Sequence, residues 1–297
     1  MLFSIIIPTY NRADLIPKTI RSVQNQTFED WECIIVDDGS TDNTKSIIED
    51  IIKQDSRFKY VYQENAERSA ARNNGIRNSS GQLICFLDSD DHFLPNHLYD
   101  LKGLIDLRRI EYGMIIYQAI NISNENEEIT MLEQPKENLV EYIYLNPVSP
   151  SRVCVFKDVL DKLNFDQDIV IVEDVILWMK IADKYPVHVT NHLGVKYHIH
   201  GENSVDRKGN GSVKMYAGVL KAKKRYPQIF SKIPSHSFRD WTSRIITNVA
   251  YHHILNQRKI LGIYWLIKAL LMKPKHIHTQ MRINHIFKLL TFRQIEI

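Results

Sequence analysis

Cysteine is scarce in this chain, with three residues among 297. Cys33, Cys85 and Cys154 each lie in an apolar, strand-like run, at spacings typical of neither a disulfide framework nor a metal site. We therefore expect three reduced cysteines in the protein core, as in a cytosolic protein. A fold held together by disulfides is excluded.

Glycine-rich phosphate loops are absent as well. No stretch matches the P-loop pattern, which argues against a nucleoside triphosphatase. Residues 8–15 contain no glycine either, although a sugar nucleotidyltransferase needs a glycine-rich loop near its first strand to hold a triphosphate.

Long apolar runs are also missing. The apolar stretch Ile260–Met272 is 13 residues long, against about 20 residues required to span a bilayer. We therefore expect no membrane span there. Met1–Ser4 has no basic segment and leads directly into an apolar run, so we also expect no signal peptide.

Acidic residues are rare in the last third of the chain. Residues 207–297 contain 18 Lys or Arg and 2 Asp or Glu, a net charge of +16, whereas residues 1–206 contain 20 and 33, a net charge of −13. Basic helices with Trp, Tyr and Leu can lie on an anionic leaflet, so we expect a cytoplasmic protein, peripheral at the inner face of the cell membrane. The alternative is a helical subdomain with a basic solvated face. No nucleic-acid-binding module accompanies the charge, and we expect no nucleic-acid partner.

The first half of the chain alternates strand-like and helix-like segments. Such alternation predicts an α/β fold with a mainly parallel sheet flanked by helices. Polar residues follow each strand, and the carboxyl ends of parallel strands meet at one edge, where ligands bind. The strand-like runs are Phe3–Ile7, Trp31–Val36, Phe58–Tyr62 and Leu83–Leu87, and the helix-like ones are Leu15–Val23 and Thr44–Ile52. Pro8 is expected to end the first strand.

Residues 88–91 read Asp-Ser-Asp-Asp and follow an apolar run. Asp88 and Asp90 can both turn toward one divalent ion that also holds a diphosphate. Hard oxygen ligands of this kind suit Mg²⁺ or Mn²⁺. The alternative is a solvated acidic turn that caps the next helix.

In order and spacing, these segments resemble family 2 glycosyltransferases with the GT-A fold. The resemblance covers roughly residues 4–206 and rests on residues 5–11 (IIIPTYN), 24–28 (QNQTF), 35–42 (IVDDGSTD), 71–76 (ARNNGI), 86–91 (FLDSDD) and 173–174 (ED). The resemblance implies that a sugar is transferred with inversion from a nucleotide-sugar donor, which is UDP-linked. It also implies that the divalent metal ion takes part. The family often has a glycine two residues after the position of Asn65. This chain has Glu67 there, followed by Arg68. The contacts of Asn65 and Arg68 with the nucleotide therefore remain open.

The resemblance implies that the polar strand ends bind the donor. Asp38 is placed to accept the imide N–H of uracil; its alternative role is to cap the next helix, which Asp37 or Asp42 would serve equally well. Tyr10 would lie against the base or be a partly buried loop tyrosine, and Arg72 would neutralise phosphate or contact the uridine. The expected donor-binding residues are Pro8, Thr9, Tyr10, Asp38, Asn65, Arg72, Asp88, Ser89 and Ser204.

Residues 197–205 contain a His-x-His pair, His198 and His200. On a strand both rings would lie on one face, as in some zinc sites, but no further ligand stands close in sequence. The resemblance instead assigns His200 to the divalent metal, with Asp88 and Asp90, or to the diphosphate, on a lid-like loop. His198 is then structural.

Glu173 and Asp174 precede an amphipathic segment. Acids at a helix start are favourable against the helix dipole alone. Inverting transfer, however, needs a carboxylate to take the proton from the acceptor hydroxyl, and one of ordinary pKa is ionised at neutral pH. The resemblance places this base in the pair; we assign it to Asp174, with Glu173 orienting the acceptor or the base.

The sequence thus predicts three regions: a nucleotide-sugar half over residues 1–110, an acceptor half over 111–206, and a basic helical extension over 207–297. The predicted function is inverting, metal-dependent transfer of a hexosyl or N-acetylhexosaminyl group to a hydroxyl of a glycan or lipid-linked saccharide, in polysaccharide biosynthesis. Two alternatives stay open, a sugar nucleotidyltransferase and a non-catalytic nucleotide-sugar-binding assembly partner.

Overall fold

The computed structural model describes residues 1–123, 126–135, 137–199, 210–272 and 283–284. The chain divides into two compact units. The sheet unit comprises Met1–Asp168 and Glu173–His200, and the helical unit comprises Ile169–Val172 and Gly201–Ile297. Each unit is described separately below.

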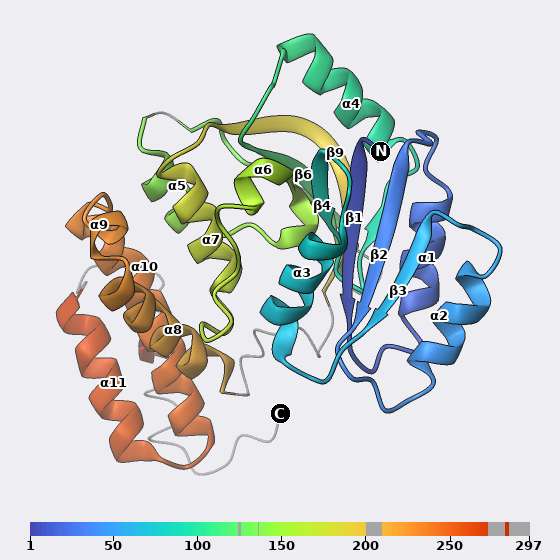
Figure 1. Ribbon diagram of the computed structural model, residues 1–297. Helices are drawn as coiled ribbons and strands as arrows, with labels where there is room; N and C mark the ends of the chain where they lie inside the picture. The colour runs from blue at the N-terminus through green and yellow to red at the C-terminus, as the bar shows by residue number, and fades with distance from the viewer. Residues whose placement is uncertain (124–125, 136, 200–209, 273–282, 285–297) are drawn as a thin grey trace. The chain divides into compact units, whose positions relative to one another are not determined.

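The amino-terminal half of the sheet unit is parallel, as predicted. Four strands lie in the order β3-β2-β1-β4 and pair in parallel: β1 (Phe3–Thr9), β2 (Trp31–Asp37), β3 (Phe58–Tyr62) and β4 (Leu83–Phe86). Three helices connect them, α1 (Ile16–Gln24), α2 (Thr44–Ile52) and α3 (Glu67–Asn78). Because helices cover both faces, β1 and β2 are buried along almost their whole length. Figure 1 shows α3 on one side of these strands and α1 and α2 on the other.

The second half of the sheet is antiparallel in part, so the sheet is mixed rather than purely parallel. Strand β8 pairs antiparallel with both β4 and β6, so the chain enters the sheet here without a parallel crossover. Strands β6 and β9 are parallel to each other, and β5 and β7 are antiparallel additions. The strands are β5 (His92–Phe93), β6 (Met114–Ser123), β7 (Asn126–Thr130), β8 (Val153–Phe156) and β9 (Val187–Ile199). The helices are α4 (His97–Arg108), α5 (Leu139–Leu145), the 3₁₀ turn Pro150–Arg152, α6 (Lys157–Leu160) and α7 (Glu173–Ala182).

Pro8 does not end β1, contrary to expectation. The strand continues to Thr9, and Pro8 pairs with Val36 in the register with β2. Along β1 the Ile6 carbonyl accepts a hydrogen bond from Leu87 N, on the side of β4. Pro8 faces the same side two residues later, beyond the last paired residue of β4. A missing N–H costs no ladder hydrogen bond at that position.

At the amino ends of these strands lies the buried carboxylate of Glu32. Its Oε1 accepts hydrogen bonds from Ser4 Oγ (2.7 Å) and from Ser80 N (2.5 Å) and Oγ (2.7 Å), and Oε2 accepts one from Lys59 Nζ (2.6 Å). Burial alone would raise the pKa of Glu32, but these hydrogen bonds outweigh it and lower the pKa to about 2. The ionised carboxylate therefore ties β1, β2, β3 and the segment before β4 together.

The helical unit contains α8 (Gly211–Arg225), α9 (Pro227–Phe230), α10 (Ser235–Leu255) and α11 (Lys259–Met272). Helices α10 and α11 pack against each other around Ala250, Ile254 and Leu266. Among the residues that the structure describes, no helix combines the length and apolar character that crossing a membrane requires.

Candidate active site

The turn after β2 joins three strand ends through Asp38. Asp38 N donates to Thr9 O (2.9 Å), at the end of β1. Asp38 Oδ1 accepts hydrogen bonds from Gln63 Nε2 (2.6 Å) and Ala66 N (2.9 Å), between β3 and α3. The Asn65 amide donates to Asp38 O (2.9 Å). Three strand ends that are distant in sequence thus meet at one buried acid.

Helix capping does not occupy Asp38. The helix α2 begins at Thr44, whose N–H donates to Asp42 Oδ1 (2.9 Å). Asp37 Oδ1 instead accepts Ser40 N (2.8 Å) within the turn. Asp42, rather than Asp38, therefore bonds to the first residue of α2, and within the described residues the second oxygen of Asp38, Oδ2, accepts no hydrogen bond.

The loops around Asp38 are packed tightly. Gly39 has φ +83°, and a Cβ placed on it would lie 2.9 Å from Asn65 N. Asn11 (φ +50°) accepts a hydrogen bond from Thr41 N (2.8 Å) through Oδ1. Tyr10, beside it, is 46% exposed. The predicted residues Thr9, Tyr10, Asp38 and Asn65 therefore lie along one connected edge, with the Tyr10 ring accessible.

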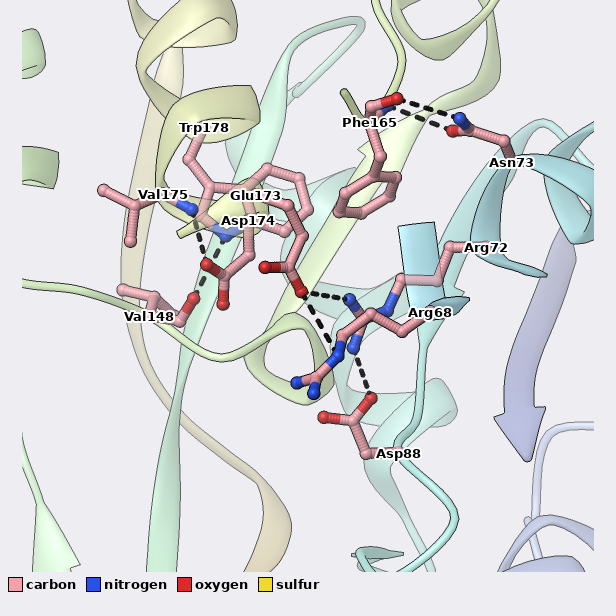
Figure 2. A network of polar contacts seen from close by, with 10 residues as sticks. All are labelled: Arg68, Arg72, Asn73, Asp88, Val148, Phe165, Glu173, Asp174, Val175 and Trp178. Atoms are coloured by element: carbon pink, nitrogen blue, oxygen red, sulfur yellow. Dashed lines mark hydrogen bonds and ion pairs between the residues drawn. The ribbon is translucent and has the colours of Figure 1, made fainter. Parts of the chain in front are cut away.

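Arg72 links the turn that follows β4 to the start of α7. Its Nη2 lies 2.8 Å from Asp88 Oδ1, and its Nη1 lies 3.2 Å from Glu173 Oε1 (Figure 2). Arg68 Nε is 3.7 Å from the same Glu173 oxygen. Burial opposes the charge of Arg72, but Asp88 and Glu173 favour it, and the net effect raises its pKa. Arg72 remains charged and holds the two predicted acidic clusters together.

A second contact set supports the guanidinium of Arg72. The guanidinium carbon lies 5.4 Å from the centre of the Phe165 ring, and this ring packs edge-on against Trp178. Asn73, next to Arg72 on α3, pairs with the Phe165 backbone through two hydrogen bonds, to O (2.9 Å) and from N (3.0 Å). Trp178 Nε1 donates to Val148 O (3.0 Å). Figure 2 shows this shell around the charged groups. Asn73, Phe165 and Trp178 were not predicted; of these, only Asn73 lies in a recognised motif.

Asp174, the predicted base, has a raised pKa. Burial and the adjacent Glu173 carboxylate raise its pKa to about 7, against the opposing effect of Arg72. Its Oδ1 accepts a hydrogen bond from Val175 N (2.7 Å), so it also serves the start of α7. Glu173 Oε2 is buried and has no hydrogen-bond partner among the described residues. The ordinary pKa assumed from sequence is therefore wrong for Asp174.

The Asp88–Asp91 turn is compact. Asp91 N donates to Asp88 O (3.0 Å), and Ser89 O accepts a hydrogen bond from Thr19 Oγ1 (2.9 Å). Asp91 is fully buried and accepts a hydrogen bond from His198 N (3.0 Å) through Oδ1. Burial and the charges of Asp88 and Asp90 raise the pKa of Asp91 well above its usual range. Asp91, absent from the predicted set, thus connects the turn to β9, which fits the structural role predicted for His198.

The donor set of this turn fits a hard divalent cation. Asp88 and Asp90 are half-buried carboxylates on one closed turn, and oxygen ligands are what Mg²⁺ and Mn²⁺ prefer. Within the described ranges, no three His, Cys, Asp or Glu side chains are grouped as metal ligands. Two protein carboxylates would leave the remaining positions to donor phosphates and water. His200 and Ser204 lie outside the described residues.

Comparison with protein families identifies the chain. The family model for glycosyl transferase family 2 matches residues 4–162, more than half of the 297 residues. The chain belongs to glycosyl transferase family 2. It is therefore an enzyme, a glycosyltransferase, as the sequence motifs predict.

The curated relatives are named as glycosyltransferases, some with their donor or acceptor and others as uncharacterized. The chain is 32% identical over 192 residues to the Escherichia coli UDP-Glc:alpha-D-GlcNAc-diphosphoundecaprenol beta-1,3-glucosyltransferase WfgD, covering 64% of this chain and 73% of WfgD. It is 43% identical over 100 residues to a Campylobacter jejuni GalNAc(5)-diNAcBac-PP-undecaprenol beta-1,3-glucosyltransferase, covering 33% of this chain and 32% of that protein. It is 35% identical over 187 residues to the uncharacterized Rickettsia conorii glycosyltransferase RC0461, covering 61% of this chain and 30% of RC0461. The match therefore spans less than a third of the latter two relatives.

Solved structures show the same fold at low identity. S. aureus TarS 1–349 in complex with UDP superimposes with a TM-score of 0.61 at 18% identity, covering 93% of each chain. The mannosyltransferase PcManGT from Pyrobaculum calidifontis, in complex with GDP-Man and Mn²⁺, gives 0.58 at 17% identity, covering 98% of this chain and 88% of that one. The GT-A fold expected from the sequence is confirmed.

Proposed function

We propose that this glycosyltransferase moves a sugar from a UDP-linked donor to a hydroxyl of a glycan or lipid-linked saccharide, with inversion at the anomeric carbon. One observation carries the proposal. Arg72 joins Asp88, at the end of β4, to Glu173, next to Asp174 at the start of α7. A single displacement needs a leaving-group side and a base side in one site, and this bridge brings acids for both into one network.

In the proposed donor complex, Asp38 recognises the nucleobase. Its Oδ1 is held by Gln63 and Ala66, which leaves Oδ2 to accept the N–H of a uracil ring. Tyr10, exposed on the adjacent loop, supplies an aromatic face for the base. TarS is described with UDP and with UDP-GlcNAc, whereas PcManGT is described with GDP-Man. The preference for UDP therefore rests on Asp38.

In the proposed chemistry, Asp174 accepts the proton of the acceptor hydroxyl. A base is most effective when its pKa lies near the working pH, and the raised pKa of Asp174 meets that condition. Burial raises this pKa most, and the adjacent Glu173, fixed by Arg72 and near Arg68, raises it further. Ser89 and Arg72 would face the diphosphate.

A divalent ion, Mn²⁺ or Mg²⁺, is expected between Asp88, Asp90 and the diphosphate, with His200 as a further ligand. When bound, it would neutralise charge that develops on the departing diphosphate. PcManGT is described with Mn²⁺. Asp88 is already paired with Arg72, so its carboxylate is oriented without the ion.

The acceptor is proposed from the relatives and from charge. WfgD and the Campylobacter jejuni enzyme are named for diphosphoundecaprenol-linked or PP-undecaprenol-linked saccharides. The basic residues after 206 would hold the enzyme near an anionic cytoplasmic leaflet that carries such an acceptor. We keep residues 1–110 as the proposed donor half, 111–206 as the acceptor half and 207–297 as the extension.

Donor turnover by the purified chain tests the proposal. UDP-, GDP- and dTDP-sugars would be incubated separately with Mn²⁺, Mg²⁺ or EDTA, and released nucleotide measured. We expect hydrolysis of a UDP-sugar that EDTA abolishes. Turnover confined to GDP-sugars would refute the role of Asp38, and absence of turnover with every donor, despite tight UDP binding, would refute the proposed donor chemistry. Once an acceptor is found, the anomeric proton coupling of the product reports inversion.

A further inference from the structure

Helix α11 is apolar around its whole circumference, although it lies at the surface. Of its 14 residues, only Lys259 and Lys268 are charged. A helix of this kind normally lies inside a protein core or contacts lipid. Here one face is buried and the opposite face is exposed, so the exposed face requires an explanation.

The buried face of α11 is fixed by close packing on α10, which Figure 1 shows beside it. Leu266 and Ala269 are buried, and Leu266 joins Ala250 and Ile254 in a small core. A Cβ on Gly262 would overlap Ile254 Cγ1 and lie 3.1 Å from Ala250 O. The glycine therefore allows close approach and sets the rotation of α11 about its axis.

The opposite face carries a stripe of exposed apolar side chains. Its members fall within about 100° of the helix circumference at 3.6 residues per turn. Their exposed fractions run from 39% for Ile263 to 88% for Ile260. The apolar stripe consists of Ile260, Ile263, Tyr264, Ile267 and Leu271. A contiguous exposed apolar patch of this kind is typical of a binding surface.

Charge around the stripe selects a lipid surface as its occupant. Residues 210–272 contain eleven Lys or Arg and one Asp. Lys268 Nζ lies 4.7 Å from the Trp265 ring and 5.4 Å from the Tyr216 ring, beside the stripe. Helices that lie in the headgroup region of an anionic bilayer typically have basic groups beside an apolar face. Tyr and Trp side chains lie beside these basic groups.

The length of α11 agrees with insertion parallel to the membrane rather than across it. Fourteen residues extend about 21 Å, whereas the hydrocarbon core is about 30 Å thick. We infer that α11 lies in the interface of an anionic membrane, with the apolar stripe inserted among the acyl chains and Lys268 at the headgroups. This deepens the proposed function, since it names the element that would bring the enzyme to a lipid-linked acceptor, and it rests on that proposal.

Site-specific fluorescence on the full chain tests this inference. The native cysteines are buried, so a nitrobenzoxadiazole label on the Ile267→Cys variant reports one position. With vesicles of 30% phosphatidylglycerol in phosphatidylcholine, we expect a blue shift and quenching by lipids brominated in their acyl chains. Vesicles of phosphatidylcholine alone should give much less of both. Binding to the anionic vesicles without a blue shift would overturn the inference.

Paired charge substitutions provide a second measurement. The double variant Ile267→Glu, Leu271→Glu should partition into the anionic vesicles at least about tenfold less than the parent chain. Leu107→Glu is the matched control, since Leu107 is 85% exposed on α4 of the sheet unit and should leave partitioning unchanged. Equal loss in both variants, or loss in neither, would contradict the inference.

Two further outcomes identify a different occupant. If the stripe is a contact between two copies, the parent chain will sediment as a dimer at micromolar concentration, and the double variant as a monomer. If another segment of this chain covers it, the label will be shielded from iodide without vesicles. Hydrolysis of soluble nucleotide-sugar without vesicles should be equal in all variants. A failure of that hydrolysis in the parent chain would refute the proposed donor chemistry and leave the membrane measurement intact.

Discussion

The two ends of the parallel strands hold buried acids in different surroundings. At the amino ends, both oxygens of Glu32 are hydrogen bonded, and its pKa falls to about 2. At the carboxyl ends, Glu173 Oε2 and Asp91 Oδ2 are buried without hydrogen-bond partners among the described residues, and the pKa of Asp174 rises to about 7. One end is therefore electrostatically satisfied, whereas the other holds buried acids whose ionised forms are disfavoured.

This difference separates stability from chemistry within one sheet. A satisfied, ionised acid such as Glu32 favours the folded state at neutral pH. Acids held close together with raised pKa values oppose folding, and they are common where a cation or substrate is to be bound. Two residues with positive φ also lie near the carboxyl ends, Asn11 in the loop after β1 and Glu67 at the start of α3.

The largest expected effect is on catalysis at the carboxyl ends. Asp174→Asn keeps shape but cannot accept a proton, so sugar transfer should fall by a factor of about 10²–10⁴. Donor affinity, measured by calorimetry with a UDP-sugar, should stay near the parent value. The matched variant is Glu173→Gln; if it is inactive while Asp174→Asn transfers sugar at the parent rate, the base is Glu173.

Loss of the Asp90 carboxylate should weaken donor binding as well as turnover. Asp90→Asn removes one of the two proposed carboxylate ligands, and we expect turnover to fall about 10²–10³-fold. UDP affinity should also lose its dependence on Mn²⁺. Thermal unfolding without ligand should change little, because Asp90 is half-buried on a turn. An active variant, or UDP affinity independent of Mn²⁺ in the parent chain, would exclude this metal site.

At the amino ends the expected effect is on stability alone. Glu32→Gln should lower the free energy of unfolding at pH 7 by about 3 kcal/mol, the value of a shift from 4.5 to about 2. Because the folded-state pKa is depressed, this contribution is fully present above about pH 4.5 and fades as pH falls through 2. Urea unfolding measures the first quantity, and kcat of the folded variant should be unchanged. A large loss of kcat would show that the two ends are coupled.

The raised pKa of Asp174 predicts the opposite stability effect. Since the folded state holds this proton up to about pH 7, ionisation destabilises the fold progressively between pH 4 and 7. Asp174→Asn should therefore raise the free energy of unfolding at pH 8 by roughly 1–3 kcal/mol, and much less at pH 4. In the parent chain, kcat/KM should rise about tenfold per pH unit below pH 7. A variant less stable than its parent at pH 8 would contradict this.

The smallest expected effect concerns strain near the donor loop. Glu67 has φ +70°, in the region that glycine adopts freely. Glu67→Gly removes a strain of about 1–2 kcal/mol but adds backbone freedom to the unfolded chain, so we expect a net gain near 0.5 kcal/mol. Arg77→Gly, on the same helix, is the control and should destabilise. Thermal unfolding of both variants measures the difference, and a destabilised Glu67→Gly would show that no strain is stored there.

Local pattern alone predicted much of this protein. The first four strands and the first two helices between them follow from apolar runs broken by polar turns, because buried parallel strands need continuous apolar residues. The order of the motifs indicated the glycosyltransferase family, which the family match confirms. The division of charge at residue 206 could also be counted directly.

Tertiary structure decided what depends on distant contacts. The antiparallel entry of β8, the tolerance of Pro8 within β1 and the pairing of β7 with β6 all depend on which strand lies alongside. Arg72 meets Asp88 and Glu173 across 16 and 101 residues of sequence, and no local pattern encodes such a pairing. The pKa of Asp174 likewise reflects burial and neighbouring charge, which exist only after the chain has folded.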